Sequence, residues 1–374
     1  MESGRLGRNR EIPNSVVLSL RGLTKRFGAV VAVDGVDLDI LRGEFVTLLG
    51  PSGCGKTTTI RMIGGYEEPD AGEIILDGVD ITYLPPRKRE IGMVFQDYAL
   101  FPHMTVAENI AYPLRMRKWS GDRIDARVTE MLELVRLDGM GRRRPWEMSG
   151  GQKQRVALAR ALAFSPQLLL MDEALGALDA KLREHMQIEI RRIQQMLQIT
   201  TIHVTHDQDE ALGMSDRVVV MREARIGQVA TPREIYANPA SVYVADFVGR
   251  INLLRARVLE HQPGATILEL DEPHLTDRSS RRLRARPAPE VAIGSSVRVG
   301  IRPEAMRIAT EPAAENSVYG AVIATKFSGP LEYVNLDIAP DRTISVITVH
   351  GDGPRADASF IHWQSDQALV LPQD

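Results

Sequence analysis

Up to about residue 248, short apolar runs alternate with segments in which apolar residues recur at helical spacing. The runs GEFVTLLG, QLLLMDE and TTIHVTH have the length of strands, whereas 178–197 has the periodicity of a long amphipathic helix. Alternation of this kind predicts an α/β domain in which helices cover a mainly parallel sheet. We therefore expect an α/β domain over residues 16–248, after an N-terminal tail over residues 1–15.

The pattern changes after Gly249. The segments TILEL, VRVGI and YVNLDI alternate apolar and polar residues, and helical periodicity is scarce. This texture predicts a small all-β domain or barrel over residues 249–374. The arginine-rich stretch 281–286 lies between such segments and is interpreted as a solvated loop, because no aromatic residues interleave with the arginines.

Composition narrows the class of protein. The chain has 374 residues, a net charge of −3 and one cysteine. The charge gives no overall reason to expect nucleic acid, and a lone Cys54 excludes an internal disulfide. The basic N-terminal tail has no apolar stretch behind it, so we expect no secretory signal, and no window has the ~18 apolar residues of a membrane span.

The segment GPSGCGKTT fits the pattern G-x-x-x-x-G-K-[ST], between an apolar strand and a predicted helix. Its glycines let successive backbone N–H groups point at a phosphate, and the helix adds its positive end. Lys56 is expected at the β- and γ-phosphates and the Thr57 hydroxyl at Mg²⁺. The segment thus predicts a nucleoside-triphosphate site made by Gly50, Pro51, Ser52, Gly53, Cys54, Gly55, Lys56, Thr57 and Thr58.

Polar residues at the ends of other strands supply the chemistry of hydrolysis. Asp172 ends an apolar strand and is expected to face Mg²⁺, while the next residue, Glu173, points elsewhere and polarises the attacking water. Gln96 ends the strand IGMVFQ and is expected at Mg²⁺ or the water; His206 ends TTIHVTH and is expected at the γ-phosphate. Phe27 is a candidate to stack on the adenine, with core packing as its alternative.

A second glycine-rich segment, MSGGQ, also leads into a helix. It has no lysine at the phosphate-loop spacing, so it does not duplicate the first site. A serine helix cap followed by glycines is one interpretation. The other is that Ser149, Gly150, Gly151 and Gln152 cover a nucleotide held by the phosphate loop of another copy.

GPSGCGKTT, Gln96, MSGGQ, LLLMDE and His206, in this order, resemble the ATPase subunit of ABC transporters over residues 18–248, and ALD at 177–179 matches that family's D-loop. The resemblance implies a P-loop ABC ATPase domain in which two copies, a homodimer, sandwich ATP and Mg²⁺. It assigns Thr57, Gln96 and Asp172 to the metal and Glu173 as general base. His206 would contact the γ-phosphate, and the segment 149–152 would act in trans.

The C-terminal part is similar to importer ATPases with an oligonucleotide-fold-like (OB-like) TOBE domain. The stretch DITYLPPRKREIGMVFQDYALFPHMTVAENIAYPLRMR is most similar to polyamine-importer ATPases, and sugar and ferric-iron importers share most of it. This implies a peripheral subunit on the cytoplasmic face of the inner membrane. Its partners would be integral permease subunits and, indirectly, an external solute-binding protein, with no nucleic acid expected.

Two alternatives come from other classes: a soluble ABC ATPase acting on ribosomes or DNA, and a P-loop kinase. The first usually has two cassettes or a coiled-coil insert, and the second needs an acceptor site in place of MSGGQ. The β domain could also bind a solute or protein and regulate the ATPase. One departure from the family is notable: Ala174 and Gly176 replace the usual proline and serine after Glu173, which predicts slower hydrolysis.

Overall fold

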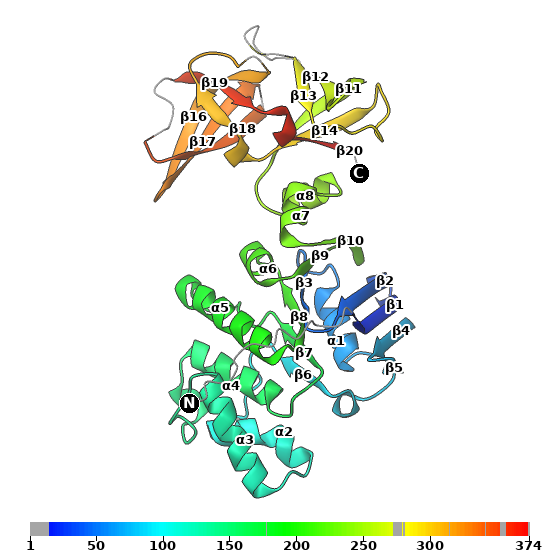
Figure 1. Cartoon of the computed structure of the whole chain (residues 1–374), viewed down its shortest axis with the longest axis vertical. Helices are drawn as coiled ribbons and strands as arrows, with labels where there is room; N and C mark the ends of the chain where they lie inside the picture. The colour runs from blue at the N-terminus through cyan, green and yellow to red at the C-terminus, as the bar shows by residue number, and fades with distance from the viewer. Residues whose placement is uncertain are drawn as a thin grey trace, which may run out of the picture. The chain divides into compact units, whose positions relative to one another are not determined.

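The computed structural model describes residues 15–176, 178–271, 279, 281–313, 315–340, 342–351 and 357–372. The chain divides into two compact units, one up to Arg233 and one from Glu234 (Figure 1). The division falls ahead of the expected boundary at residue 248.

A six-stranded sheet lies at the centre of the first unit. Its strands, in spatial order, are β10 (Arg225–Ala230), β9 (Arg217–Arg222), β3 (Phe45–Leu49), β8 (Thr200–Thr205), β7 (Leu168–Asp172) and β6 (Ile91–Val94). All neighbours pair in parallel except β10, which pairs antiparallel with β9. Every residue of β3, β7 and β8 is buried, as the continuous apolar runs predict.

A second, antiparallel sheet belongs to the same unit and was not predicted separately. Its order is β2 (Val30–Leu41), β1 (Val16–Phe27), β4 (Ala71–Leu76) and β5 (Val79–Asp80). The strands β1 and β2 pair antiparallel along most of their length. Strand–helix alternation indicates only the parallel sheet, because antiparallel neighbours need no helix between them.

Helices cover the two faces of the central sheet. They are α1 (Lys56–Gly64), α2 (Val106–Met116), α3 (Gly121–Leu134), α4 (Gly150–Leu162), α5 (Ala180–Leu197) and α6 (Gln208–Met214), with short 3₁₀ turns at Pro86–Lys88 and Pro145–Glu147. Alternate residues of β7 enter different cores: Leu168 and Leu170 pack with α1, whereas Leu169 and Met171 pack with α2 to α5. The helices α1 and α4 therefore lie on opposite faces of the sheet.

The second unit contains two five-stranded antiparallel sheets that share one core. The first, in order, is β13 (Arg282–Ala285), β12 (Ala265–Leu270), β11 (Asn252–Gln262), β14 (Ser296–Ile301) and β20 (Ala368–Pro372); the second is β15 (Arg307–Ala309), β19 (Ala358–Trp363), β16 (Asn316–Ser328), β17 (Leu331–Ala339) and β18 (Arg342–Val349). Two 3₁₀ turns, Pro303–Ala305 and Ser365–Gln367, complete it. The all-β prediction is confirmed, but interpreting 281–286 as a loop was wrong, because β13 runs through it.

Two short helices, α7 (Pro232–Ala237) and α8 (Val242–Phe247), explain the early division of the chain. Arg302 is buried in the second unit and donates to the carbonyl oxygens of Tyr236 (3.0 Å), Ala245 (3.1 Å) and Arg250 (3.0 Å). One guanidinium thus ties the segment that carries both helices to the β-sheets. These contacts are long-range, so the sequence pattern did not indicate them.

Candidate functional site

The phosphate loop connects β3 to α1 and brings the backbone close to its neighbours. Gly55 has φ of +103°, and a Cβ there would lie 2.3 Å from the carbonyl oxygen of Ala32. Gly55 is also the N-cap of α1, and no side chain caps the helix or places an acid in its first turn. Its first N–H groups thus lack the side-chain acceptor that α4 and α5 have in Ser149 and Asp179. This uncapped helix start fits a phosphate group.

Lys56 is buried against the same loop. Its ammonium group donates to the carbonyl oxygens of Gly50 and Pro51, both at 2.8 Å, and lies 3.8 Å from Cys54 Sγ. These contacts hold the lysine against the backbone of the loop. The other loop residues surround it: Pro51, Ser52 and Gly53 are exposed, Cys54 is buried, and Thr58 is half-buried.

Thr57 and Asp172 meet where α1 and β7 come together. The Thr57 hydroxyl donates to Asp172 Oδ1 over 3.3 Å. Burial raises the pKa of the Asp172 carboxyl, and the neighbouring Arg61 opposes this shift. Within the described ranges, no group of three or more His, Cys, Asp or Glu side chains is arranged so that it could hold a metal ion by itself. A pair of oxygen donors fits Mg²⁺, which takes one or two protein ligands and completes its shell with phosphates and water.

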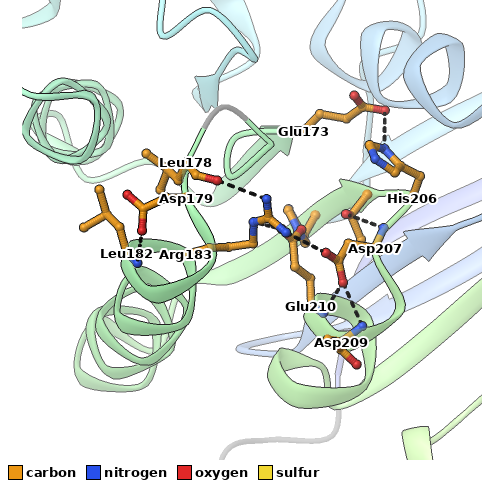
Figure 2. Close-up of polar contacts among 11 residues, drawn as sticks. Glu173, Leu178, Asp179, Leu182, Arg183, His206, Asp207, Asp209 and Glu210 are labelled. Atoms are coloured by element: carbon orange, nitrogen blue, oxygen red, sulfur yellow. Dashed lines mark hydrogen bonds and ion pairs between the residues drawn. The ribbon is translucent and has the colours of Figure 1, made fainter. Parts of the chain in front are cut away.

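Glu173 and His206 approach each other from neighbouring strand ends. β7 stops at Asp172, and Glu173 adopts a left-handed φ of +45° while its N–H bonds to Val204 O at 3.0 Å. Its carboxylate oxygen Oε1 then lies 3.6 Å from Nδ1 of His206, whose imidazole is largely exposed (Figure 2). The geometry brings together a carboxylate and an imidazole at the sheet edge where the phosphate loop also begins.

Within the described part of the chain, Gln96 and Phe27 make no hydrogen bond or ion pair with the Glu173–His206 pair. β6 ends at Val94, two residues earlier than predicted, and Gln96 stands exposed in the turn that follows. Among the described residues, no hydrogen bond joins Gln96 to Asp172 or Glu173. Phe27 is the last residue of β1, half-exposed, with the Lys25 ammonium 5.3 Å from its ring centre. Their assignments to Mg²⁺ and adenine stay predictions.

The MSGGQ segment starts α4 with a capping box. Ser149 Oγ accepts from the Gln152 N–H at 3.4 Å, and Gln152 Oε1 accepts from the Ser149 N–H at 3.0 Å. Ser149 and Gly150 are exposed, whereas Gly151 is buried, and a Cβ there would lie 3.0 Å from the side chain of Leu182. The local cap is therefore real, and the trans role stays a prediction. Residue 177 of the predicted D-loop lies outside the described residues.

Sequence reasoning missed the ion pairs behind this site. Arg183 bonds to Asp207, which directly follows His206, and the buried Glu210 bonds to His203. The acidic run DQDE after His206 was the available signal, but nothing in the sequence indicated its basic partner on α5.

The comparisons with known proteins agree with this geometry. The family model described as "ABC transporter" matches residues 33–176. The chain is 43% identical to the spermidine/putrescine import ATP-binding protein PotA of Methylococcus capsulatus, over 96% of this chain and 93% of that protein. It is 44% identical to the PotA of Nitrosospira multiformis, over 95% of this chain and 98% of that protein.

Two solved structures resemble the first unit. The dimeric post-hydrolysis ATP-binding cassette MJ0796, bound to ADP and Pi, is 32% identical with a TM-score of 0.52, over 58% of this chain and 99% of that one. The cbiO1 protein of Clostridium perfringens, part of an ABC transporter complex, is 31% identical with a TM-score of 0.56, over 60% of this chain and 91% of that one.

Fold and site together define a P-loop ATPase of the cassette type. The chain belongs to the ABC transporter family, as an ATP-binding subunit that hydrolyses ATP. Within the part of the chain that the structure describes, no helix is long and apolar enough to cross a membrane.

Proposed function

We propose that this chain is the ATPase subunit of a polyamine importer, peripheral to the cytoplasmic face of the inner membrane. The observation that carries the proposal is the identity of 43–44% to spermidine/putrescine import ATP-binding proteins over nearly the full length of both chains. That span includes most of the all-β unit, whereas the two solved cassettes cover 58% and 60% of this chain. Sugar or ferric-iron import by the same machinery is the alternative.

In this proposal the phosphate loop holds ATP. Lys56 and the N–H groups at the start of α1 bind the phosphates, and Thr57 and Asp172 bind Mg²⁺, with Gln96 as a further ligand. Mg²⁺, when bound, neutralises phosphate charge that would otherwise repel the attacking water. Glu173 accepts the proton of that water, and His206, 3.6 Å away, holds the carboxylate and the γ-phosphate in one arrangement.

The second ATPase subunit is proposed to be another copy of this chain. The helices that start at the phosphate loop and at MSGGQ lie on opposite faces of the central sheet. Ser149 and Gly150 are exposed, which leaves them available to a nucleotide on a partner. ATP then favours the closed dimer, because only that state gains these contacts, and hydrolysis lets it open. Integral permease subunits and an external solute-binding protein complete the importer.

The test is purification of the tagged chain from detergent-solubilised native membranes. We expect multi-span permease proteins to copurify, and the complex to hydrolyse ATP faster when its solute-binding protein carries spermidine or putrescine. Stimulation by a sugar or by ferric iron instead would replace the substrate. Recovery of the chain alone, or with ribosomes or DNA, would overturn the transporter assignment while leaving the ATPase family intact.

A further inference from the structure

Arg183 lies in the first turns of α5 and contacts both the segment before α5 and the start of α6 (Figure 2). One terminal nitrogen donates to Asp207 Oδ2 and the other to the carbonyl oxygen of Leu178, each at 3.0 Å. Its Nε lies 3.9 Å from Glu210 Oε1. A cation near a helix N-terminus is disfavoured by the helix dipole. Helix stability therefore does not explain why an arginine occupies position 183. The contacts of its side chain are the remaining explanation.

The contact with Asp207 fixes the backbone on one side of His206. Asp207 Oδ1 accepts from the N–H groups of Asp209 (2.9 Å) and Glu210 (3.2 Å) and so caps α6. Its own N–H donates to Thr205 Oγ1 at 3.0 Å. Because Oδ1 is used by the cap, Arg183 holds the remaining oxygen. A shift of the guanidinium therefore moves the residue that follows His206.

The ion pair with Glu210 reaches the strand on the other side of His206. Glu210 is buried and bonds to Nε2 of the fully buried His203 at 3.0 Å. A carboxylate only accepts, so this nitrogen carries the hydrogen. The Arg183 Nε is buried without a hydrogen-bond partner, and 3.9 Å is too long for a hydrogen bond to Glu210. A movement of about 1 Å would complete that bond.

The other end of the network lies beneath the MSGGQ segment. A Cβ built on Gly150 would lie 3.5 Å from the Leu178 side chain, and one built on Gly151 would lie 3.0 Å from that of Leu182. Leu178 supplies the carbonyl oxygen that Arg183 holds, and Leu182 precedes Arg183 in α5. Packing transmits displacement here, because well-packed side chains leave no space to absorb it.

We propose that Arg183 is a positioning residue that couples the MSGGQ segment to His206. This rests on the proposed function, in which MSGGQ contacts the ATP of the partner copy and His206 contacts the chain's own ATP. Binding of the partner's nucleotide shifts Leu178 and Leu182. Arg183 passes this shift to Asp207, which follows His206, and to Glu210, which bonds to His203 ahead of His206. One arginine thereby links the two ATP sites of a dimer.

The test uses Arg183→Lys in the full-length chain, with Arg192→Lys as the matched control. Lysine keeps the charge but has no planar fork, so it does not hold Leu178 and Asp207 in one fixed geometry. Arg192 lies on the same helix and also bonds to one carbonyl, Leu134 O, and one carboxylate, Glu189. We expect R183K to lower kcat about tenfold with KM for ATP within twofold, and R192K to leave both unchanged.

Asp207→Asn is the second variant, because asparagine still caps α6 but loses the ionic partner of Arg183. We expect it to reproduce the kcat loss of R183K, and the double variant to be no slower than either single one. Wild-type kcat in both single variants would overturn the proposal. An equal loss of kcat in R183K and R192K would also overturn the proposal, since it would reflect a general effect of arginine replacement on α5.

The link to MSGGQ is tested by combining R183K with Ser149→Ala. If Arg183 couples MSGGQ to His206, each single change lowers kcat about tenfold, and the double variant also loses only about tenfold. Multiplication of the two effects, to about a hundredfold, would overturn the coupling. Glu173→Gln distinguishes failure of the proposed function from failure of the inference about Arg183. Full activity in E173Q refutes the proposed site and the inference with it. An inactive E173Q beside an unaffected R183K refutes the inference alone.

Discussion

The Glu173 carboxylate lies 3.6 Å from the His206 imidazole, although the two residues are 33 positions apart in the chain and all of α5 lies between them. Parallel pairing of β7 with β8 sets Asp172 opposite Val204. Glu173 and His206 directly follow these two strands, so they lie at the same edge of the sheet. The pair therefore depends on strand register. In the proposed function, this carboxylate accepts a proton from the attacking water.

Glu173→Gln is predicted to remove turnover and retain ATP binding. Glutamine keeps the shape of the side chain but does not act as a base, so we expect kcat to fall by about 10²- to 10⁴-fold. Steady-state hydrolysis and titration with a fluorescent ATP analogue measure the two properties. Glu133→Gln, an exposed position on α3, is the control and keeps wild-type rates. A kcat within tenfold of wild type in E173Q would show that another group is the base.

The double change Ala174→Pro and Gly176→Ser is predicted to raise kcat. Proline fixes φ at position 174 and so restricts the backbone directly after Glu173, which alanine leaves free. Serine fits at position 176, where a Cβ meets nothing closer than the Glu173 carbonyl oxygen at 3.6 Å. Equal steady-state rates of the double variant and the natural chain would refute the prediction of slower hydrolysis.

Gly55→Ala is predicted to destabilise the first unit and weaken ATP binding. The new Cβ would meet the Ala32 carbonyl oxygen at 2.3 Å, in addition to backbone strain of about 1–3 kcal/mol. Gly139→Ala is the matched control, because Gly139 also has a positive φ, +73°, but open space around its Cβ position. Urea unfolding of both variants isolates the contact with Ala32. Equal losses of unfolding free energy would show that the contact is absent.

Asp172→Asn is predicted to stabilise the metal-free protein at neutral pH and to abolish Mg²⁺ binding. Burial raises the pKa of Asp172 above its ordinary value of 3.8, so the fold favours the protonated form. The ionised carboxylate therefore lowers stability at pH values above its folded pKa, and this penalty disappears as the pH falls below 3.8. Asparagine removes the charge and still accepts from Thr57.

Thermal unfolding at pH 7 and at low pH, without metal, checks the sign. The Tm of D172N should exceed that of the natural chain at pH 7 by a few degrees, and the difference should shrink in acid. A lower Tm for D172N at pH 7 would mean that the carboxylate contributes stability in its ionised form.

Local sequence determined the nucleotide chemistry. The phosphate loop, the acids at the end of β7 and the serine before α4 were predicted because each depends on a short run of residues and on the element it begins or ends. The all-β character of the second unit followed from alternation in the same way. The family followed because five such segments occur in a fixed order.

Tertiary structure decided what long-range contacts control. The buried guanidinium of Arg89 donates to carbonyl oxygens from four different residues and ties α1 to the segment after β5, although nothing around position 89 distinguishes it from a surface arginine. Arg302 likewise ties the segment of α7 and α8 to the β-sheets, and this is why the second unit begins before residue 248. Arg183 joins α5 to Asp207, the residue after His206. An arginine has the same local pattern whether its partners lie in water or across the fold. Its role depends on which carbonyl and carboxylate groups the packed elements bring within reach.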